Sequence, residues 1–354
     1  MSNKEIVEKF SKAQDSLIIQ QSDFSLSTIA NMVENDSIDI APHYQRRDRW
    51  NTEKQSALIE SFLINVPVPP VYLSEDDYGR YSVIDGKQRI TAIFDFLTGK
   101  LKLKKLKEFP QLEGATFASL PPQLKNVLSV RPFIRVITLL KQSDPELKYE
   151  VFLRLNTGGE KLKPQEIRNV AYSGPMNDLL FELAEHPFLI RKLKITSEKS
   201  TAFRNMDDLE HVLRFFTIRE SWENMGAVLS VEMDRFLSRN RESNTEEFKE
   251  MFQVAIGRCE ELWGDTAFQK PANGTWREQL ISPLYDAQMV AVSILNDDEI
   301  ESLRIHRDEI VNGTRRLFEE DDDFVKSVSQ STNNPNSIYR RVTVIVEMLR
   351  GIPA

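Results

Sequence analysis

The sequence predicts an α+β protein, with an α/β N-terminal domain over residues 1–172 and an all-helical C-terminal domain over residues 173–354. The length supports two domains, since one domain takes roughly 150 residues. The first half alternates short apolar runs typical of strands with amphipathic patterns typical of helices. From about residue 173 the strand signal fades and helical spacing of apolar residues continues to the end.

The N-terminal elements follow from turn, cap and periodicity signals. Thr52 with Gln55 has capping-box spacing at a helix start, and Gly99 ends a later helix. Asp144 and Pro145 suit the first positions of another helix. In order, we expect a strand at 37–40, a helix from 52 that ends by 67, strands at 71–73 and 80–84, a helix at 87–97, a Lys-rich hairpin-like stretch, a helix after 121, a strand at 133–140, helix 145–155, a loop at 156–163, and a helix near 164.

The C-terminal half carries successive apolar stripes at helical spacing. An acidic run at 319–323 is interpreted as a solvated helix end. The expected helical stripes are 209–216, 233–237, 248–263, 284–295, 310–318 and 338–349.

Composition excludes several classes of protein. Hydrophobic residues make up 40% and charged residues 28%, which is a globular composition. No apolar run approaches ~18 residues, so we expect no membrane span. The first 13 residues are charged, which predicts no signal peptide. Cys259 is the single cysteine, so an intrachain disulfide is impossible. We expect a cytoplasmic protein with neither zinc nor haem.

Charge is distributed unevenly along the chain. The formal net charge is −8, yet residues 87–141 carry 11 basic and 3 acidic side chains. Residues 171–354 carry 22 basic and 32 acidic side chains. A basic block inside an acidic protein allows a local anion site without overall basicity.

The sharpest motif is a strand that runs through Asp85 and Gly86 directly into a helix beginning Lys87-Gln88-Arg89. Cations in a first helical turn face the positive end of the helix dipole, at a cost of about 0.3–1 kcal/mol each. A bound phosphate would reverse that sign, because backbone N–H groups and two cations would converge on one anion. Asp85 would then be an N-cap, a Mg²⁺ ligand or a base. The alternative is a solvated helix start that Asp85 caps.

A second motif, residues 44–50, holds three arginines and two aromatic residues. Arg46 or Arg47 could clamp a phosphate while Tyr44 or Trp50 stacks on a base. In the other interpretation Trp50 fills the core and the arginines pair with nearby acids. His43, beside this motif, is the one histidine that we single out as a possible site residue; the other three are expected to be packed or on the surface.

Two further segments have both a structural and a functional interpretation. Residues 99–107 alternate Leu and Lys, which predicts Leu inward and Lys outward on a strand or extended loop. The lysines would protect an edge or contact a DNA backbone. Asp207 and Glu210 have capping-box spacing, which favours a structural role for both.

Four ordered blocks resemble a known family. Asp85-Gly86-Lys87-Gln88-Arg89 is similar to the Asp-Gly-Gln-Gln-Arg signature of the N-terminal domain of GmrSD-type, modification-dependent restriction enzymes. Residues 40–50, 152–169 and 204–216 resemble other blocks of that family, so the resemblance covers roughly residues 24–220. Lys87 stands where the family usually has Gln, which puts an amide-specific role at this position in doubt.

The resemblance implies a ParB/sulfiredoxin-like fold, in which the strand-to-helix junction commonly holds nucleotide phosphate. Some members hydrolyse nucleoside triphosphates and act in defence against phages with modified DNA. Their nuclease partner, a His-Asn-His module, is not evident in this sequence, where four histidines lie singly. The resemblance makes Asn156, Thr157 and Gly158, at a two-glycine turn, a site wall or metal contacts.

Three functions therefore stay open. In the first, an anti-phage protein acts on modified DNA, for example with glucosylated cytosine, and hydrolyses a nucleoside triphosphate with Mg²⁺. In the second, a glycosylase excises the modified base without a nucleotide. In the third, a non-catalytic subunit binds DNA or nucleotide for a separate nuclease. The expected catalytic residues are Asp85, Gln88 and Arg89, and the expected phosphate, nucleotide or DNA contacts are Gly86, Lys87, Tyr44, Gln45, Arg46, Asn156, Thr157 and Gly158.

Overall fold

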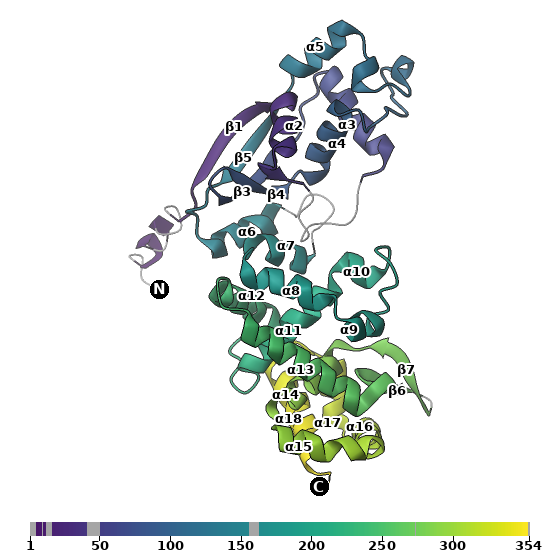
Figure 1. Ribbon diagram of the computed structural model, residues 1–354. Helices are drawn as coiled ribbons and strands as arrows, with labels where there is room; N and C mark the ends of the chain where they lie inside the picture. Colours follow the sequence, from purple (N-terminus) through teal and green to yellow (C-terminus); the bar gives the residue numbers. More distant parts are fainter. Residues whose placement is uncertain are drawn as a thin grey trace. The chain divides into compact units, whose positions relative to one another are not determined.

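In the computed structural model, the described residues are 5–8, 10–11, 16–40, 50–155, 163–272 and 274–352. The chain divides into two compact units, Met1–Ala171 and Tyr172–Ala354. Figure 1 draws the elements of each unit, which are treated separately below.

The N-terminal unit is built on a mixed five-stranded sheet with the strand order β1-β5-β3-β4-β2. β1 with β5 and β3 with β4 are antiparallel, whereas β3 with β5 and β2 with β4 are parallel. Tyr72 lies opposite Asp85 in the β3–β4 ladder, and Asp85 is the last residue of its strand. The strands are β1 (Ile19–Ser25), β2 (Ile38–Asp39), β3 (Val71–Asp77), β4 (Arg80–Asp85) and β5 (Phe133–Leu139).

Helices cover both faces of this sheet, because successive strand residues point to opposite sides. On β4, Val83 belongs to the large core cluster that the first four helices share, whereas Ile84 packs with Ile167 on the other face. Figure 1 shows these two helical layers. The first layer holds α2 (Leu26–Glu34), α3 (Thr52–Leu63), α4 (Lys87–Leu97) and α5 (Pro122–Val130), with the short helices η1 (Pro110–Leu112) and η2 (Phe117–Ser119); the second holds α6 (Pro145–Leu155) and α7 (Pro164–Ala171).

Two helix starts differ from those that the sequence predicts. α3 is capped by Asn51, whose side chain accepts the backbone N–H of Lys54, so the predicted capping box of Thr52 and Gln55 is wrong. Ser25 caps α2 at the end of β1, and neither of these two elements was predicted. β1 escapes notice because it alternates only weakly and stays largely exposed at a sheet edge.

The Lys-rich stretch is an extended loop without strand assignment. Leu101, Leu103 and Leu106 are buried while the lysines between them are exposed, which confirms the predicted inward leucines. The loop is pinned by Glu60 of α3, whose carboxylate accepts the backbone N–H groups of Lys107, Glu108 and Phe109 at 3.2, 2.7 and 3.2 Å. Burial raises the pKa of Glu60, but these three hydrogen bonds outweigh it and hold that pKa below its ordinary value.

The C-terminal unit is a helical array around α14 (Ser282–Ile294), which is buried from Leu284 through Val292. A helix that is buried on all sides lies in the interior, where polar residues such as its Asp286 and Gln288 need partners. The other helices are α8 (Pro175–Ala184), α9 (Pro187–Lys192), α10 (Thr201–Asn205), α11 (Asp207–Ser221), α12 (Leu229–Asn240), α13 (Glu246–Trp263), α15 (Asp297–Leu303), α16 (Arg307–Glu320), α17 (Asp322–Ser329) and α18 (Pro335–Arg350), with η3 (Gly264–Thr266) and η4 (Arg304–His306).

This unit is not all-helical, contrary to the prediction. An antiparallel hairpin joins β6 (Gln269–Ala272) to β7 (Thr275–Leu280), and Gly274 in its turn has a φ of +78°. Both strands are short and mostly polar, so period-two apolar patterning is absent. The signal available was the Asn273-Gly274 dipeptide, which favours a tight hairpin turn.

A buried ionic network ties α11, α14 and α18 together. Arg214 donates to both carboxylate oxygens of Asp286, at 3.0 and 2.5 Å, and Arg341 donates to the same carboxylate at 2.6 Å. Asp286 and Arg341 have no exposed side-chain surface. Burial raises the pKa of Asp286, but the charges of Arg214 and Arg341 outweigh it and hold the pKa below its ordinary value.

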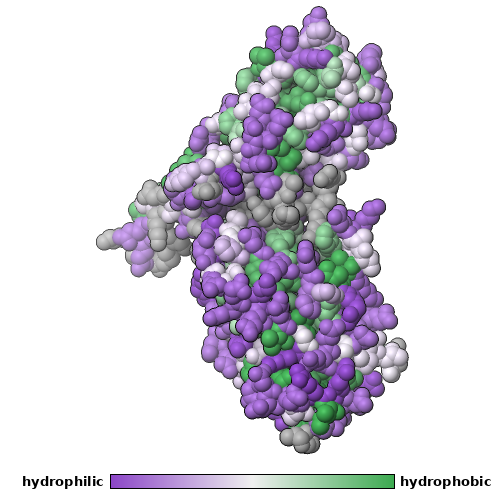
Figure 2. All heavy atoms as spheres, in the orientation of Figure 1, coloured by the Kyte–Doolittle hydropathy of each residue, from purple (hydrophilic) through white to green (hydrophobic). Residues whose placement is uncertain are grey.

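Hydrophilic residues cover most of the molecular face drawn in Figure 2, and hydrophobic residues occur on it in separate small groups. None of the helices that the structure describes is both long and apolar enough to cross a membrane.

Candidate functional site

The β4–α4 junction turns on Gly86, whose φ of +98° lies in the left-handed region. A Cβ at this position would stand 2.7 Å from Cγ2 of Val71, closer than real side-chain contacts allow. Glycine is therefore required here both by backbone conformation and by the close approach of β3. Since Gly86 is also the N-cap residue of α4, it offers no side-chain oxygen to the N–H groups of the first turn.

Asp85 does not cap α4, which corrects the simpler of the two interpretations made from sequence. Its carboxylate instead accepts a hydrogen bond from the Arg89 guanidinium at 2.5 Å, four residues further on. The Asp85 side chain is 43% exposed and that of Arg89 only 14%. The Arg89 Nε is buried and has no hydrogen-bond partner within the described chain. The pair thus places an accessible carboxylate and an incompletely satisfied guanidinium at the mouth of the turn.

Gln88 connects the junction to the segment before α3. Its Oε1 accepts the backbone N–H of Trp50 at 2.9 Å. Trp50 is partly buried against the core cluster of the first helical layer, in agreement with the predicted packing role. Gln88 therefore anchors the residue that ends the arginine-rich motif.

Two groups of expected site residues lie outside the described residues. Tyr44, Gln45 and Arg46 fall in 41–49, together with His43, and Asn156, Thr157 and Gly158 fall in 156–162. The residues that adjoin these segments can be placed. Trp50 is bound by Gln88, and Leu155 packs against the cluster that contains Ile84, the neighbour of Asp85.

α7 adds a group of buried polar residues that sequence reasoning did not assign to the site. Gln165, Glu166, Arg168 and Asn169 are each at most 2% exposed, around Ile167, which packs near the end of β4. Gln165 Nε2 donates to Asn169 Oδ1 at 2.9 Å, while Gln165 Oε1 is buried without a hydrogen-bond partner in the described chain. The available signal was the position of these residues in the block 152–169 that resembles the GmrSD-type family.

The junction suits an anion better than a metal ion whose ligands all come from protein side chains. Helix α4 presents its positive end without a side-chain cap, and Lys87 and Arg89 lie in the same first turn. Among the described residues, no group of three or more His, Cys, Asp or Glu side chains is placed to hold a metal ion. Asp85 is a single carboxylate ligand.

Three arginines of the C-terminal unit make structural contacts. Arg214 is buried in the network with Asp286. Arg239 pairs with Glu220 at 2.8 Å, and Arg241 donates to the carbonyl of Ser173 at 2.6 Å. These bonds give the three arginines structural roles within the C-terminal unit.

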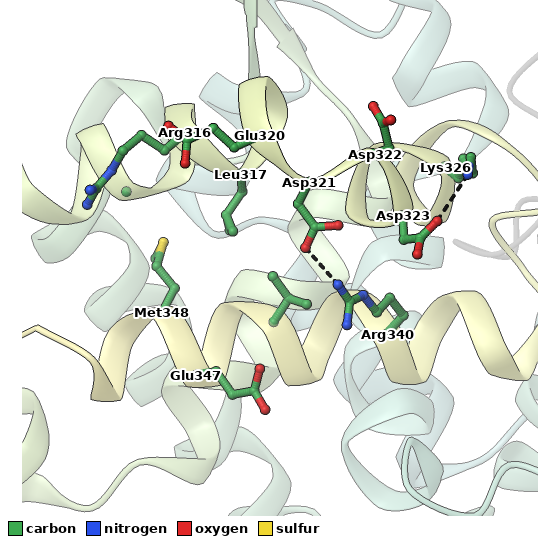
Figure 3. A pocket seen from close by; sticks show the side chains of 12 residues that line it. Arg316, Leu317, Glu320, Asp321, Asp322, Asp323, Lys326, Arg340, Glu347 and Met348 are labelled. Atoms are coloured by element: carbon green, nitrogen blue, oxygen red, sulfur yellow. Dashed lines mark hydrogen bonds and ion pairs between the residues drawn. The ribbon is translucent and has the colours of Figure 1, made fainter.

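The acidic run borders a cavity of about 810 Å³ in the C-terminal unit. Figure 3 shows Asp321 directed toward Arg340 and Asp323 toward Lys326, with N–O distances of 2.7 and 3.0 Å. Asp321 also caps α17 by accepting the N–H of Phe324. The run lies where α16 ends and α17 begins, which agrees with the predicted helix end, whereas the ion pairs of Asp321 and Asp323 were not predicted.

Comparison with known proteins matches the N-terminal unit. Residues 27–173 match the model of the family described as "GmrSD restriction endonuclease, N-terminal domain". No curated protein and no solved structure matches the chain. The match spans Asp85 through Arg89 and so confirms the resemblance that the sequence motifs indicate. Residues 27–173 therefore form a domain of the GmrSD N-terminal family.

Proposed function

We propose that this protein is a restriction-type defence protein that binds phosphate at the β4–α4 junction and hydrolyses a nucleoside triphosphate when it meets modified DNA. The observation that carries the proposal is the Gly86 turn. It brings the uncapped start of α4, the Asp85 carboxylate and the Arg89 guanidinium to one point. The family name supports DNA as the partner.

The junction divides the chemistry among its residues. Backbone N–H groups of α4 and the Lys87 ammonium would bind phosphate oxygens. The negative charge of the phosphate would offset the repulsion between Lys87 and the positive end of the α4 dipole. Arg89, fixed by Asp85, would direct its guanidinium at the transferred phosphoryl group, whose charge spreads over its oxygens. Gln88 would position the nucleotide or water, and its side chain also binds the backbone of Trp50.

A magnesium ion fits this site as part of the nucleotide complex. Mg²⁺ usually binds one or two protein carboxylates and completes its shell with phosphate oxygens and water. Asp85 is the accessible carboxylate here, and one of its oxygens lies outside the bond to Arg89. The ion would supply charge neutralisation on the phosphates, while the chain positions them.

The mixed sheet with a strand-to-helix turn supports a ParB/sulfiredoxin-like assignment for this unit. The junction after β4 is where such folds hold phosphate, and the sequence motifs add Tyr44, Gln45, Arg46, Asn156, Thr157 and Gly158 as expected phosphate, nucleotide or DNA contacts. Gly86 allows a phosphate to approach the backbone closely, because no Cβ intervenes.

Base excision is the second candidate, and the exposure of Asp85 favours it. A half-exposed carboxylate paired with Arg89 could stabilise an oxocarbenium-like transition state or activate water. Lys87 would then grip DNA phosphate beside a flipped, sugar-modified base.

The test combines both activities in one assay. The full chain is incubated with plain and glucosylated-cytosine DNA, with and without ATP or GTP and Mg²⁺, and released phosphate, free base and nicks are measured. Phosphate release stimulated by modified DNA supports the first function, and abasic sites without nucleotide support the second. If the chain releases no product but still binds DNA or nucleotide, it is a binding subunit of a separate nuclease.

Matched variants locate the activity. Lys87→Ala should weaken nucleotide or DNA-phosphate binding, whereas Lys125→Ala on α5 should not. Equal behaviour of the two variants would place phosphate binding away from the junction.

A further inference from the structure

The second cavity, of about 540 Å³, lies wholly inside the C-terminal unit and is lined by residues of α9, α10, α11, β7 and the first turn of α14. Lys192, Asp207, His211, Glu278 and Ser282 are among its lining residues. We propose that Ser282 and His211 form the nucleophile and base of a second hydrolytic centre, which acts on carboxylic esters. This proposal does not depend on the function proposed for the β4–α4 junction.

The geometry of the pair meets the requirements for an activated serine. Ser282 Oγ lies 3.1 Å from His211 Nε2 although the two residues are 71 positions apart. His211 Nδ1 contacts the backbone carbonyl oxygen of Asp207. A carbonyl only accepts hydrogen bonds, so Nδ1 carries the proton and Nε2 presents its lone pair. Ser282 must therefore donate to Nε2, which is the arrangement that a general base needs.

The imidazole is held in this orientation on a third side as well. The Tyr285 ring stands edge-on to it, with centroids 4.9 Å apart and an interplanar angle of 85°. His211 is only 6% exposed. Burial, and next the charge of Arg214, lower the pKa of His211, which keeps the ring neutral and able to take a proton.

Lys192 is one of two lysines that line this cavity, beside the acidic residues Asp207, Glu210 and Glu278. Its Nζ donates to the carbonyl of Asp265 at 2.6 Å and lies over the Phe188 ring. Burial lowers the pKa of Lys192 to about 8, so the ammonium form still prevails at neutral pH. A cation at the wall of a half-closed cavity suits a reaction that develops negative charge on a carbonyl oxygen. A neutral ester supplies that oxygen.

The reaction balances within the pair and water. Ser282 Oγ attacks the ester carbonyl carbon, and its proton passes to His211 Nε2. The carbon–oxygen bond to the leaving group breaks, and the departing alkoxide takes that proton to leave as an alcohol. A water molecule then gives its proton to Nε2 and attacks the acyl carbon, after which the Ser282–acyl bond breaks. The released Ser282 oxygen takes the proton back, and a carboxylic acid leaves.

Reaction of the full chain with a fluorophosphonate tests the proposal directly, because this reagent modifies activated serines. We expect one adduct, mapped to Ser282 by peptide mass spectrometry, and slow turnover of p-nitrophenyl acetate. Ser282→Ala should abolish both. Ser293→Ala, on the same helix, should change neither, since the Ser293 hydroxyl donates to the Val290 carbonyl.

The base is tested with His211→Gln, for which we expect roughly a hundred-fold slower labelling of the folded protein. Because this buried change can also disturb folding, a second variant is needed. Cys259 is the single cysteine and is buried, so Ser282→Cys provides the one accessible thiol in the described chain. Its alkylation at neutral pH should be at least roughly ten-fold faster than that of a free thiol if His211 activates it. A Ser282 that reacts no faster than Ser293, or a thiol introduced by Ser282→Cys that reacts like a free thiol, would overturn the proposal.

Discussion

The two units each contain an aspartate–arginine contact of 2.5 Å, Asp85 with Arg89 and Asp286 with Arg214, yet the two pairs differ in burial. The Asp85 side chain is 43% exposed, whereas that of Asp286 is fully buried and bound by a second arginine. Removing charges from water is costly unless every partner is in place. Equal distances therefore predict opposite roles, with ligand chemistry at the exposed pair and cohesion of the helical unit at the buried one.

Sequence spacing explains part of the difference. Asp85 and Arg89 are four residues apart across one turn, so their contact needs no tertiary structure. Asp286 receives Arg214 and Arg341 from helices 72 and 55 positions away, so its contacts exist only in the folded unit. Stability measurements on variants of both pairs, and of a site with intermediate burial, test whether burial sets these roles.

The largest expected effect is that of Asp286→Asn. The variant leaves the buried Arg341 without its carboxylate and Arg214 with Glu210 alone, at 3.7 Å, and should lose about 3–5 kcal/mol of unfolding free energy. Urea unfolding of the full chain, followed by circular dichroism, measures the loss in the transition of the C-terminal unit. Glu301→Gln, which removes the exposed partner of Arg304, serves as the control and should leave that transition unchanged. Similar effects of the two substitutions would refute the role assigned to burial.

Glu60→Gln should give an intermediate effect, because a buried carboxylate here binds backbone N–H groups in place of arginine. Gln places an amide NH₂ toward three donors, so at least one loses its acceptor, at a cost of about 1–3 kcal/mol. The three hydrogen bonds hold the pKa of Glu60 below its ordinary value despite burial, which acts in the opposite direction. Its contribution is therefore present above that ordinary value and disappears as the pH falls through the folded pKa. Thermal unfolding of wild type and variant should converge in acid, and a constant difference between them would contradict this account.

Gly86→Ala should destabilise the junction by about 2 kcal/mol, since it combines a positive φ with a 2.7 Å approach to Val71. Gly79→Ala is the matched control, because Gly79 has φ +77° but open space around its would-be Cβ. Its cost should be about 1 kcal/mol, from backbone strain alone. Differential scanning calorimetry of both variants separates the two causes. Equal losses would mean that β3 shifts freely, and that Gly86 is required by conformation alone.

Much of the N-terminal unit could be predicted from sequence because its signals are local. Turn residues and apolar periodicity locate β4, α4 and the glycine between them. The pairing of Asp85 with Arg89 was not predicted, since the N-cap preference of aspartate accounts equally well for Asp85 at the start of the predicted helix. The order of strands in the sheet also lies beyond local signals, because β5 inserts between β1 and β3 through long-range contacts.

The limit of prediction from sequence is clearer in the C-terminal unit. Leu209, Val212 and Leu213 are core residues as predicted. The predicted capping box of Asp207 and Glu210 is wrong, because Met206 is the N-cap residue of α11 and no side chain caps that helix. His211 was expected to be a packed or surface residue, and its partner Ser282 follows a hairpin that had not been predicted. Pairings across 71 residues leave no trace in one sequence.

The smallest stability change, with the largest loss of function, is expected for Asp85→Asn. The substitution is nearly isosteric and removes one charge from a half-exposed pair, so the unfolding free energy should change by less than about 1 kcal/mol. Activity should disappear, since an amide can neither ligate Mg²⁺ as an anion nor stabilise positive charge in a glycosidic transition state.

Arg89→Gln tests the other residue of the pair. Its side chain is only 14% exposed, so it should lower the melting temperature more than Asp85→Asn, whereas the sequence alone predicts relief of repulsion at the helix start. Phosphate and base release by each variant, measured beside its melting curve, distinguish the roles of the two residues. An Asp85→Asn protein with wild-type turnover would show that the exposed pair is a helix-start contact and that the chemistry lies elsewhere.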